Sequence, residues 1–140
     1  MIGFKGIDIA KAGFFRPEVI QRAKDRALMS RLSRFGAFVR QRARHSIRKR
    51  KAISAPGSPP SSHVGTLRDL ILFAFDAIRR SVVIGPVLFR AGSEAANLLE
   101  EGGTATRKGK TLTYRARPYM GPAFREELAK LPPSWRDSIK

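Results

Sequence analysis

Residues 17–50 constrain the fold most strongly, because their pattern predicts a single long basic helix. Pro17 suits the first helical position, where its missing N–H would have no partner within the helix. Apolar residues then recur at steps of three, four or one, which places them in one stripe along a helix. They are Ile20, Ala23, Ala27, Leu28, Leu32, Phe35, Val39, Ala43 and Ile47. Such a helix would be roughly 50 Å long, longer than one small domain is wide.

Gly36 is the only glycine in this stretch. A glycine inside a helix costs about 1 kcal/mol relative to alanine, so its presence indicates a close contact at that point. A helix that extends beyond its own core also predicts contacts with other molecules.

The positive charge is concentrated in the same region. The 140 residues contain 28 Lys and Arg against 11 Asp and Glu, which gives a net charge of +17. Residues 1–51 hold fifteen basic and three acidic residues, and thus +12 of this total. This surplus favours nucleic acid or an acidic protein surface as a partner. A solvated basic face is a third interpretation, because the basic residues lie on several faces of the helix without an RNA-binding motif.

If nucleic acid is the partner, the C-terminal end of the long helix is the expected contact. The candidate residues are Arg40, Arg44, Arg48, Lys49 and Arg50. Affinity that depends on such phosphate contacts falls steeply as salt rises.

Composition excludes several other classes. Without cysteine the chain has no disulfide, no thiolate metal site and no cysteine nucleophile. It lacks the run of about 18 apolar residues that crosses a bilayer, and residues 1–15 lack a signal-peptide pattern. We expect one soluble, non-exported domain over residues 1–140, with an N-terminal arm at 1–15 and a C-terminal tail at 131–140.

Residues 52–65 predict an extended loop, because three prolines together with glycine and serine exclude a helix or a central strand. Two interpretations stay open: a flexible connector, or a stiff, partly polyproline arm that lies against a neighbour. The candidate interface residues of the arm are Pro56, Pro59, Pro60 and His63. Trp135 is a further candidate, because its large ring has no local partner and must pack on the body or on another subunit.

The rest of the chain predicts short elements, from alternating apolar residues and from glycine and proline at turns and helix ends. They are a hairpin at 67–85 with its turn near 76–80, a helix at 94–101 ended by Gly102 and Gly103, a hairpin at 104–116 with Gly109 in its turn, and a helix at 123–130 opened by Pro122. We therefore predict an α+β fold with a long N-terminal basic helix, one small antiparallel sheet of two hairpins and two short helices.

No catalytic pattern is present in the sequence. His45 lies among arginines, and His63 lies beside serines that lack a nucleophile elbow. The pairs Glu100-Glu101 and Glu126-Glu127 are adjacent on helices, where neighbouring side chains point apart. There is no P-loop, no Rossmann fingerprint and no HExxH motif. We expect no enzymatic activity, no cofactor and no metal.

Four short motifs follow one another in a fixed order. They are the segment Ser54 to His63 followed by Gly65-Thr66-Leu67-Arg68, then Val82-Val83-Ile84-Gly85-Pro86, then Leu98-Leu99-Glu100-Glu101-Gly102-Gly103, and then Arg117-Pro118-Tyr119-Met120-Gly121-Pro122-Ala123. In this order they resemble the proline-rich loop with its "GxLR" turn, the "VxVGP" strand, the "xxExG" helix end and the "RPFLxPAL" helix start of tailed-phage minor tail and neck proteins. The resemblance covers about residues 17–140.

The resemblance implies a structural virion protein of the neck, either a tail-completion or a head–tail joining component. Members of the family form rings, commonly six-fold, between the portal-proximal neck and the tail tube. The expected partners are copies of the chain, neighbouring neck and tail proteins, and genome DNA that passes through the ring. Neither a membrane nor a small-molecule substrate is expected, and the location would be the virion, or the host cytoplasm during assembly. The alternative is a basic nucleic-acid-binding protein.

Overall fold

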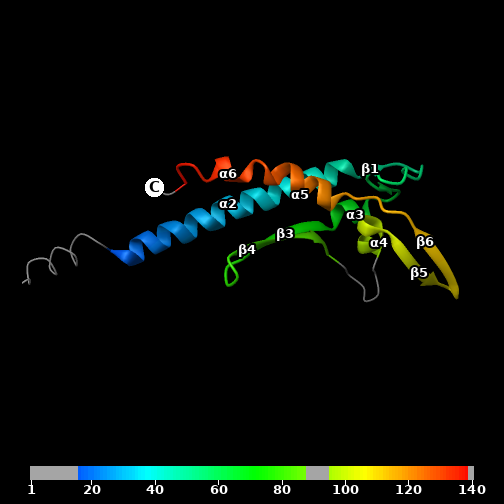
Figure 1. The fold of residues 1–140 in the computed structure, drawn as a ribbon, viewed down its shortest axis with the longest axis horizontal. Helices are drawn as coiled ribbons and strands as arrows, with labels where there is room; N and C mark the ends of the chain where they lie inside the picture. Colours follow the sequence, from blue (N-terminus) through cyan, green and yellow to red (C-terminus); the bar gives the residue numbers. More distant parts are fainter. Residues whose placement is uncertain (1–15, 88–94, 139–140) are drawn as a thin grey trace, which may run out of the picture.

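The computed structural model describes residues 16–87 and 95–138, so the arm predicted at 1–15 lies outside the described residues. The long helix α2 runs along the long axis of the molecule, and the other elements gather along its sides (Figure 1). The elements are α2 (Pro17–Ser46), β1 (Arg48–Lys49), β2 (Ser61–Ser62), α3 (Thr66–Asp69), β3 (Ile71–Asp76), β4 (Ser81–Pro86), α4 (Ala95–Glu101), β5 (Gly103–Arg107), β6 (Lys110–Tyr114), α5 (Met120–Leu128) and α6 (Leu131–Ser134).

Helix α2 begins at Pro17 as predicted, and its 30 residues give a length of about 45 Å. Its predicted end near Arg50 is wrong. Ile47 already has extended backbone angles, and Arg48–Lys49 pairs in parallel with Ser61–Ser62. Strand pairing therefore replaces the helical hydrogen bonds after Ser46.

The core lies where α2 passes between the β3–β4 hairpin and α5 (Figure 1). It is a small cluster of buried side chains: Phe35, Val39, Ala43 and Ile47 from α2 and the residue after it, Ile71 from β3, and Tyr119 and Ala123 at the start of α5. The α2 residues of this cluster all belong to the second half of the helix. In the first half, Val19, Ile20 and Met29 are exposed, so the helix does extend beyond its core.

Gly36 marks a close contact, as expected from its position in the helix. A Cβ atom at this position would lie 2.7 Å from Val82 Cγ2 and 2.9 Å from Phe73 Cδ2. The missing side chain therefore allows β3 and β4 to approach α2 closely.

Both predicted hairpins are present and antiparallel. β3 pairs with β4 across a turn at residues 77–80, and β5 pairs with β6 across Lys108-Gly109. The single sheet predicted from them is wrong, because each hairpin is a separate two-stranded sheet. The first hairpin also begins later than residue 67, because Thr66–Asp69 forms α3. The α+β class is thus confirmed, with four short helices rather than two in the part of the chain that the structure describes.

Helix α5 begins at Met120, three residues before its predicted start. The reason is a cap from another helix: the Glu100 carboxylate, in α4, accepts the backbone N–H groups of Tyr119, Met120 and Gly121 at 2.9, 3.0 and 2.7 Å. These donors would otherwise have no partner within α5. Pro122 consequently lies inside the first turn instead of opening the helix.

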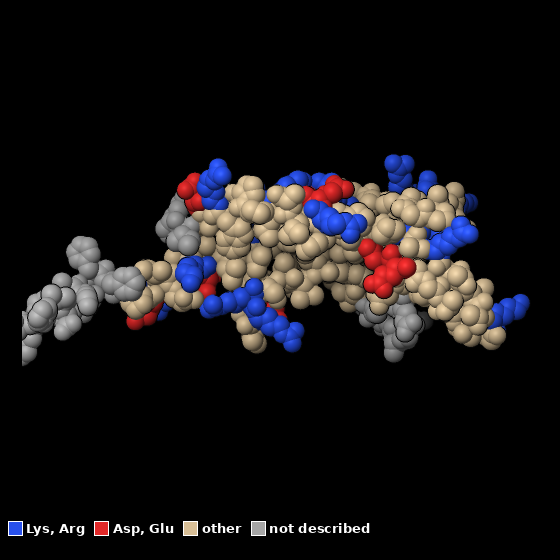
Figure 2. Space-filling view, viewed as in Figure 1, with Lys and Arg blue, Asp and Glu red and all other residues tan. Residues whose placement is uncertain are grey.

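Basic side chains are spread along the molecule rather than gathered in one place. On the face shown in Figure 2, Lys and Arg form separate groups over the whole length, with uncharged surface between them. This face therefore has no continuous basic stripe of the kind that follows a nucleic-acid backbone.

Candidate protein-docking groove

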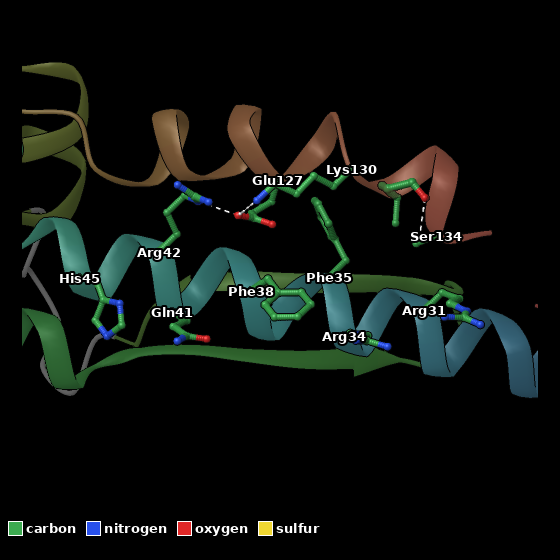
Figure 3. A pocket seen from close by; sticks show the side chains of 11 residues that line it. Arg31, Arg34, Phe35, Phe38, Gln41, Arg42, His45, Glu127, Lys130 and Ser134 are labelled. Atoms are coloured by element: carbon green, nitrogen blue, oxygen red, sulfur yellow. Dashed lines mark hydrogen bonds and ion pairs between the residues drawn. The ribbon is translucent and has the colours of Figure 1, made fainter. Parts of the chain in front are cut away.

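A groove of about 490 Å³ runs between α2 and the α5–α6 segment (Figure 3). Its lining residues are Arg31, Arg34, Phe35, Phe38, Gln41, Arg42 and His45 on α2, with Glu127, Lys130, Leu131 and Ser134 on the other wall. On α2 these residues recur at steps of three and one, which places them on one face of the helix. The other wall has the same steps but crosses from the end of α5 through Lys130 into α6.

Aromatic and aliphatic side chains form the floor of the groove. The ring of Phe35, 7% exposed, meets the ring of Phe124 edge-on with 5.6 Å between centroids. Phe38 is 45% exposed, and the Arg34 guanidinium lies 5.6 Å from its ring centroid. Leu131 packs against the core cluster. The groove therefore offers an accessible apolar surface at Phe38 above a rigid aromatic contact.

One ion-pair network holds the two walls together. Arg42 Nε donates to Glu127 Oε1 at 2.6 Å, and Lys130 Nζ donates to the same oxygen at 2.9 Å (Figure 3). Arg42 also pairs with Glu126 through its Nη1 atom. A single arginine thus contacts both Glu126 and Glu127, although neighbouring side chains on a helix were expected to point apart.

Glu127 is buried, being only 6% exposed. Burial by itself would raise the pKa of its carboxyl, but the hydrogen bonds and charges of Lys130 and Arg42 outweigh burial and hold the pKa below its ordinary value. The hydrogen bond to Glu127, with the charges of Glu126 and Glu127, raises the pKa of Arg42. Glu127 therefore stays ionised at neutral pH and clamps α5 to α2.

The groove carries an excess of positive charge. Arg31, Arg34, Arg42 and Lys130 line it together with one carboxylate, Glu127. Arg42 and Lys130 are engaged by Glu127, whereas Arg31 and Arg34 have no carboxylate within 4.0 Å among residues 16–87 and 95–138. Two arginines at one end of the groove thus remain available to an acidic ligand.

The five candidate nucleic-acid contacts do not form one basic surface. Arg40 Nε donates to the Ile71 carbonyl at 2.9 Å, and Arg44 pairs with Asp69 at 3.1 Å. Arg50 bonds the Ser61 hydroxyl at 3.0 Å. Arg48 and Lys49 are exposed in β1. Two of the five side chains are thus committed to internal contacts that fix α2 against β3 and α3.

The candidate interface residues of the loop differ in how far their side chains are exposed to solvent. Pro56 and His63 are exposed, Pro59 is half-buried, and Pro60 is buried. His63 and Pro60 line a small hollow of about 90 Å³. The chain itself covers Pro60, whereas Pro56 and His63 are accessible to a neighbour.

The loop at 52–65 folds against its own chain. Gly57 N donates to the Ala116 carbonyl at 2.8 Å, and Arg117 Nε donates to the carbonyl of the buried Ser54 at 3.0 Å. These hydrogen bonds to residues 116 and 117 fix the path of the loop, and its contact with a neighbour stays a prediction.

Trp135 follows α6 and is half-buried. The α6 helix lies over the middle of α2, whereas β1 and the loop after it lie near one end of the molecule (Figure 1). Trp135 and the loop prolines therefore lie on separate parts of the surface.

The sequence reasoning missed the groove. The candidate nucleic-acid contacts lie towards the C-terminal end of α2 and beyond it, and they do not include the groove arginines Arg31 and Arg34. A usable signal was present: Arg31, Arg34, Phe35 and Phe38 follow the i, i+3, i+4, i+7 spacing that lines one helix face. The second wall, about 90 residues away in sequence, has no local signal that links it to the first.

Comparison with known proteins gives no further guide to this site: no family model matches the chain, and no curated protein or solved structure is similar to it. Within the described ranges, no helix combines the length and apolar character needed to cross a membrane. The same ranges hold no group of three or more His, Asp or Glu side chains placed to bind a metal ion.

Proposed function

We propose that this protein is a structural component of a tailed-phage virion, located in the neck or head–tail connection, and that it works by packing against copies of itself and adjoining neck and tail proteins. One observation carries the proposal. Among the described residues, thirteen large hydrophobic side chains are exposed, whereas nine hydrophobic residues are buried, four of them alanines. Apolar surface on this scale favours burial against other protein chains.

The distribution of these side chains also supports assembly. Val19, Ile20 and Met29 lie on the part of α2 that extends beyond the core, and Leu112 lies on the β5–β6 hairpin. The two strands of this hairpin are exposed along most of their length. A hairpin on its own is marginally stable in water, so a neighbouring subunit that covers it would stabilise it. Such unlike patches suit the heterologous contacts that close a ring.

The four motifs that carry the phage-family resemblance lie on the following elements. Gly65 is the N-cap of α3, Thr66-Leu67-Arg68 lies within α3, and Val82 to Pro86 lies in strand β4. Leu98 to Gly103 spans the end of α4, and Arg117 to Ala123 leads into α5, which α6 follows.

The proposal is tested on particles. Phage particles produced by the genome that encodes this chain would be purified and their protein content measured by quantitative mass spectrometry. We expect the chain at a fixed low copy number per particle, with six as the proposed ring number, and antibody label at the head–tail junction. Particles that lack the chain, while it is abundant in the lysate, would contradict the proposal.

The alternative function, binding of nucleic acid, has one supporting observation: Arg48, Lys49 and Arg50 are consecutive and exposed. A DNA duplex titration at 50 and 200 mM salt separates the two functions. A DNA-binding protein that makes about six phosphate contacts loses roughly a thousandfold in affinity over this range. We expect no measurable duplex binding at the higher salt.

A further inference from the structure

The groove between α2 and α5–α6 has the geometry of a two-helix surface that lacks a third helix. Its α2 wall runs from Arg31 to His45, about 21 Å or four helical turns. The opposite wall runs from Glu127 to Ser134 at matching steps. Helices pack by inserting side chains at such spacing between the rows of a partner, and an amphipathic helix recognises a groove through residues at i, i+3, i+4 and i+7.

We infer that this groove binds an acidic amphipathic helix of a different protein, an inference that rests on the proposed function because it names one neighbour of the assembled subunit. The apolar residues of that helix would pack on Phe38 and Leu131. Its carboxylates would pair with Arg31 and Arg34 at one end of the groove, because these two cations have no acidic partner among the described residues.

A second copy of this chain is a poor occupant, because most of its carboxylates in the described residues are already engaged. Of the nine Asp and Glu among the described residues, six have partners. Asp25, Asp69, Asp76, Glu126 and Glu127 form ion pairs, and Glu100 caps α5. Residues 1–15 carry two lysines and one aspartate, so their composition does not supply negative charge either. The three carboxylates without a partner among the described residues are Glu18 in α2, Glu101 in α4 and Asp137 after α6. Because they lie on three different segments, no helix of a second copy presents two of them, and an acidic helix of another protein matches the groove better.

Nucleic acid fits the groove less well than an acidic helix does. A phosphate backbone needs a track of cations, whereas the centre of this groove is the apolar surface of Phe35, Phe38 and Leu131. Two of its four cations are also held by Glu127. An amphipathic helix offers apolar and acidic groups together, as this lining requires.

The test uses the full-length protein and three probes. The first probe is a synthetic helix with Leu at i, i+3, i+4 and i+7 and Glu or Asp elsewhere. The second has the same composition, but its leucines are distributed around the helix. The third is a single-stranded oligonucleotide of equal charge. Affinity is measured by fluorescence anisotropy at 150 mM salt, and each variant is checked for a wild-type melting curve.

Two charge-matched double variants locate the binding site. R31E with R34E reverses the groove arginines, and R22E with R26E reverses two exposed arginines of α2 that do not line the groove. We expect the first to weaken binding of the amphipathic probe about tenfold or more, and the second less than about twofold. Phe38→Ser tests the apolar contact in the same way and should also cost about tenfold.

The inference is supported if the protein binds the amphipathic probe more tightly than the other two probes, and if only the groove variants lose this preference. Any of four results would overturn it. Both peptides bind equally, both double variants lose affinity equally, the oligonucleotide binds more tightly through the groove residues, or neither peptide binds. Sedimentation of the same samples separates this inference from the proposed function. A defined oligomer that ignores the amphipathic probe defeats the groove inference alone, and a monomer that binds the probe defeats the assembly proposal alone.

Discussion

Glu100 and Gly121 are joined by a hydrogen bond of 2.7 Å from the backbone N–H of Gly121 to the Glu100 carboxylate. Tyr119 and Met120 donate to the other oxygen of the same carboxylate, so one side chain of α4 fixes the start of α5. This contact connects the β5–β6 end of the molecule to the wall of the groove.

Glu100→Ala should lower the free energy of unfolding by about 1–3 kcal/mol, because the N–H groups at the start of α5 lose their acceptor. The measurement is urea denaturation. Glu101→Ala is the matched control, since this neighbour is exposed and should change stability by less than about 0.5 kcal/mol. Equal effects of the two substitutions would show that the cap contributes nothing.

Gly36→Ala should destabilise the fold by about 1–3 kcal/mol despite the better helix propensity of alanine, because Val82 and Phe73 must move away from the new methyl group. Gly85→Ala is the control. No atom lies within 4 Å of a Cβ built there, and the smaller entropy of the unfolded chain should leave stability unchanged or raise it by up to about 1 kcal/mol. Thermal melts of the two variants make the comparison, and a Gly36→Ala protein as stable as wild type would contradict the close packing of α2 on the hairpin.

Glu127→Gln should cost about 1–3 kcal/mol at pH 7, because two cations lose their charged partner. The pKa of Glu127 is lower in the folded protein than its ordinary value of 4.5. Its stabilisation is therefore complete above about pH 4.5 and disappears as the pH falls through the folded pKa. The stability gap between wild type and variant should narrow from pH 6 to pH 3. Glu101→Gln is the control, because this exposed carboxylate lies outside the network and its loss should change stability by less than about 0.5 kcal/mol. A gap that is independent of pH would contradict the ion-pair network.

Tyr119 should make the protein sensitive to alkali. Burial, together with the nearby charge of Glu100, raises the pKa of Tyr119 to about 12 from 10.0. Since the pKa is higher in the folded state, the stabilisation is fully present below pH 10 and is lost between pH 10 and about pH 12. Relative to Tyr119→Phe, wild type should lose stability over this range.

The titration of Tyr119 can be observed directly. The chain has two tyrosines, so the tyrosinate absorbance of a Tyr114→Phe protein reports Tyr119 alone. A midpoint near 10 while the protein remains folded would contradict the burial of its hydroxyl.

Most secondary structure could be predicted from the sequence, because its signals are local. Pro17 starts α2, Gly102 ends α4, and Gly109 turns the second hairpin; each acts through its own backbone conformation. The end of α2 and the start of α5 could not be predicted, since both depend on distant partners: β2 pairs with β1, and Glu100 caps α5.

The groove illustrates the same limit. The α2 wall has a helical spacing that can be read from the sequence, but the pairing of Arg42 with Glu127 joins residues 85 positions apart. Nothing in the local pattern says that Arg40 and Arg44 bond to neighbouring elements while Arg31 and Arg34 have no carboxylate partner.

Sedimentation velocity of the full-length protein at 150 mM salt, from 1 to 100 µM, tests assembly most directly. We expect a single closed oligomer, near 94 kDa for six copies of the 15.6 kDa chain. Met29→Asp, which places a charge at an apolar side chain that is 56% exposed, should shift the distribution towards monomer, whereas Ser30→Asp beside it should not. A wild-type protein that sediments as a 15.6 kDa monomer at every concentration would contradict a role in ring assembly.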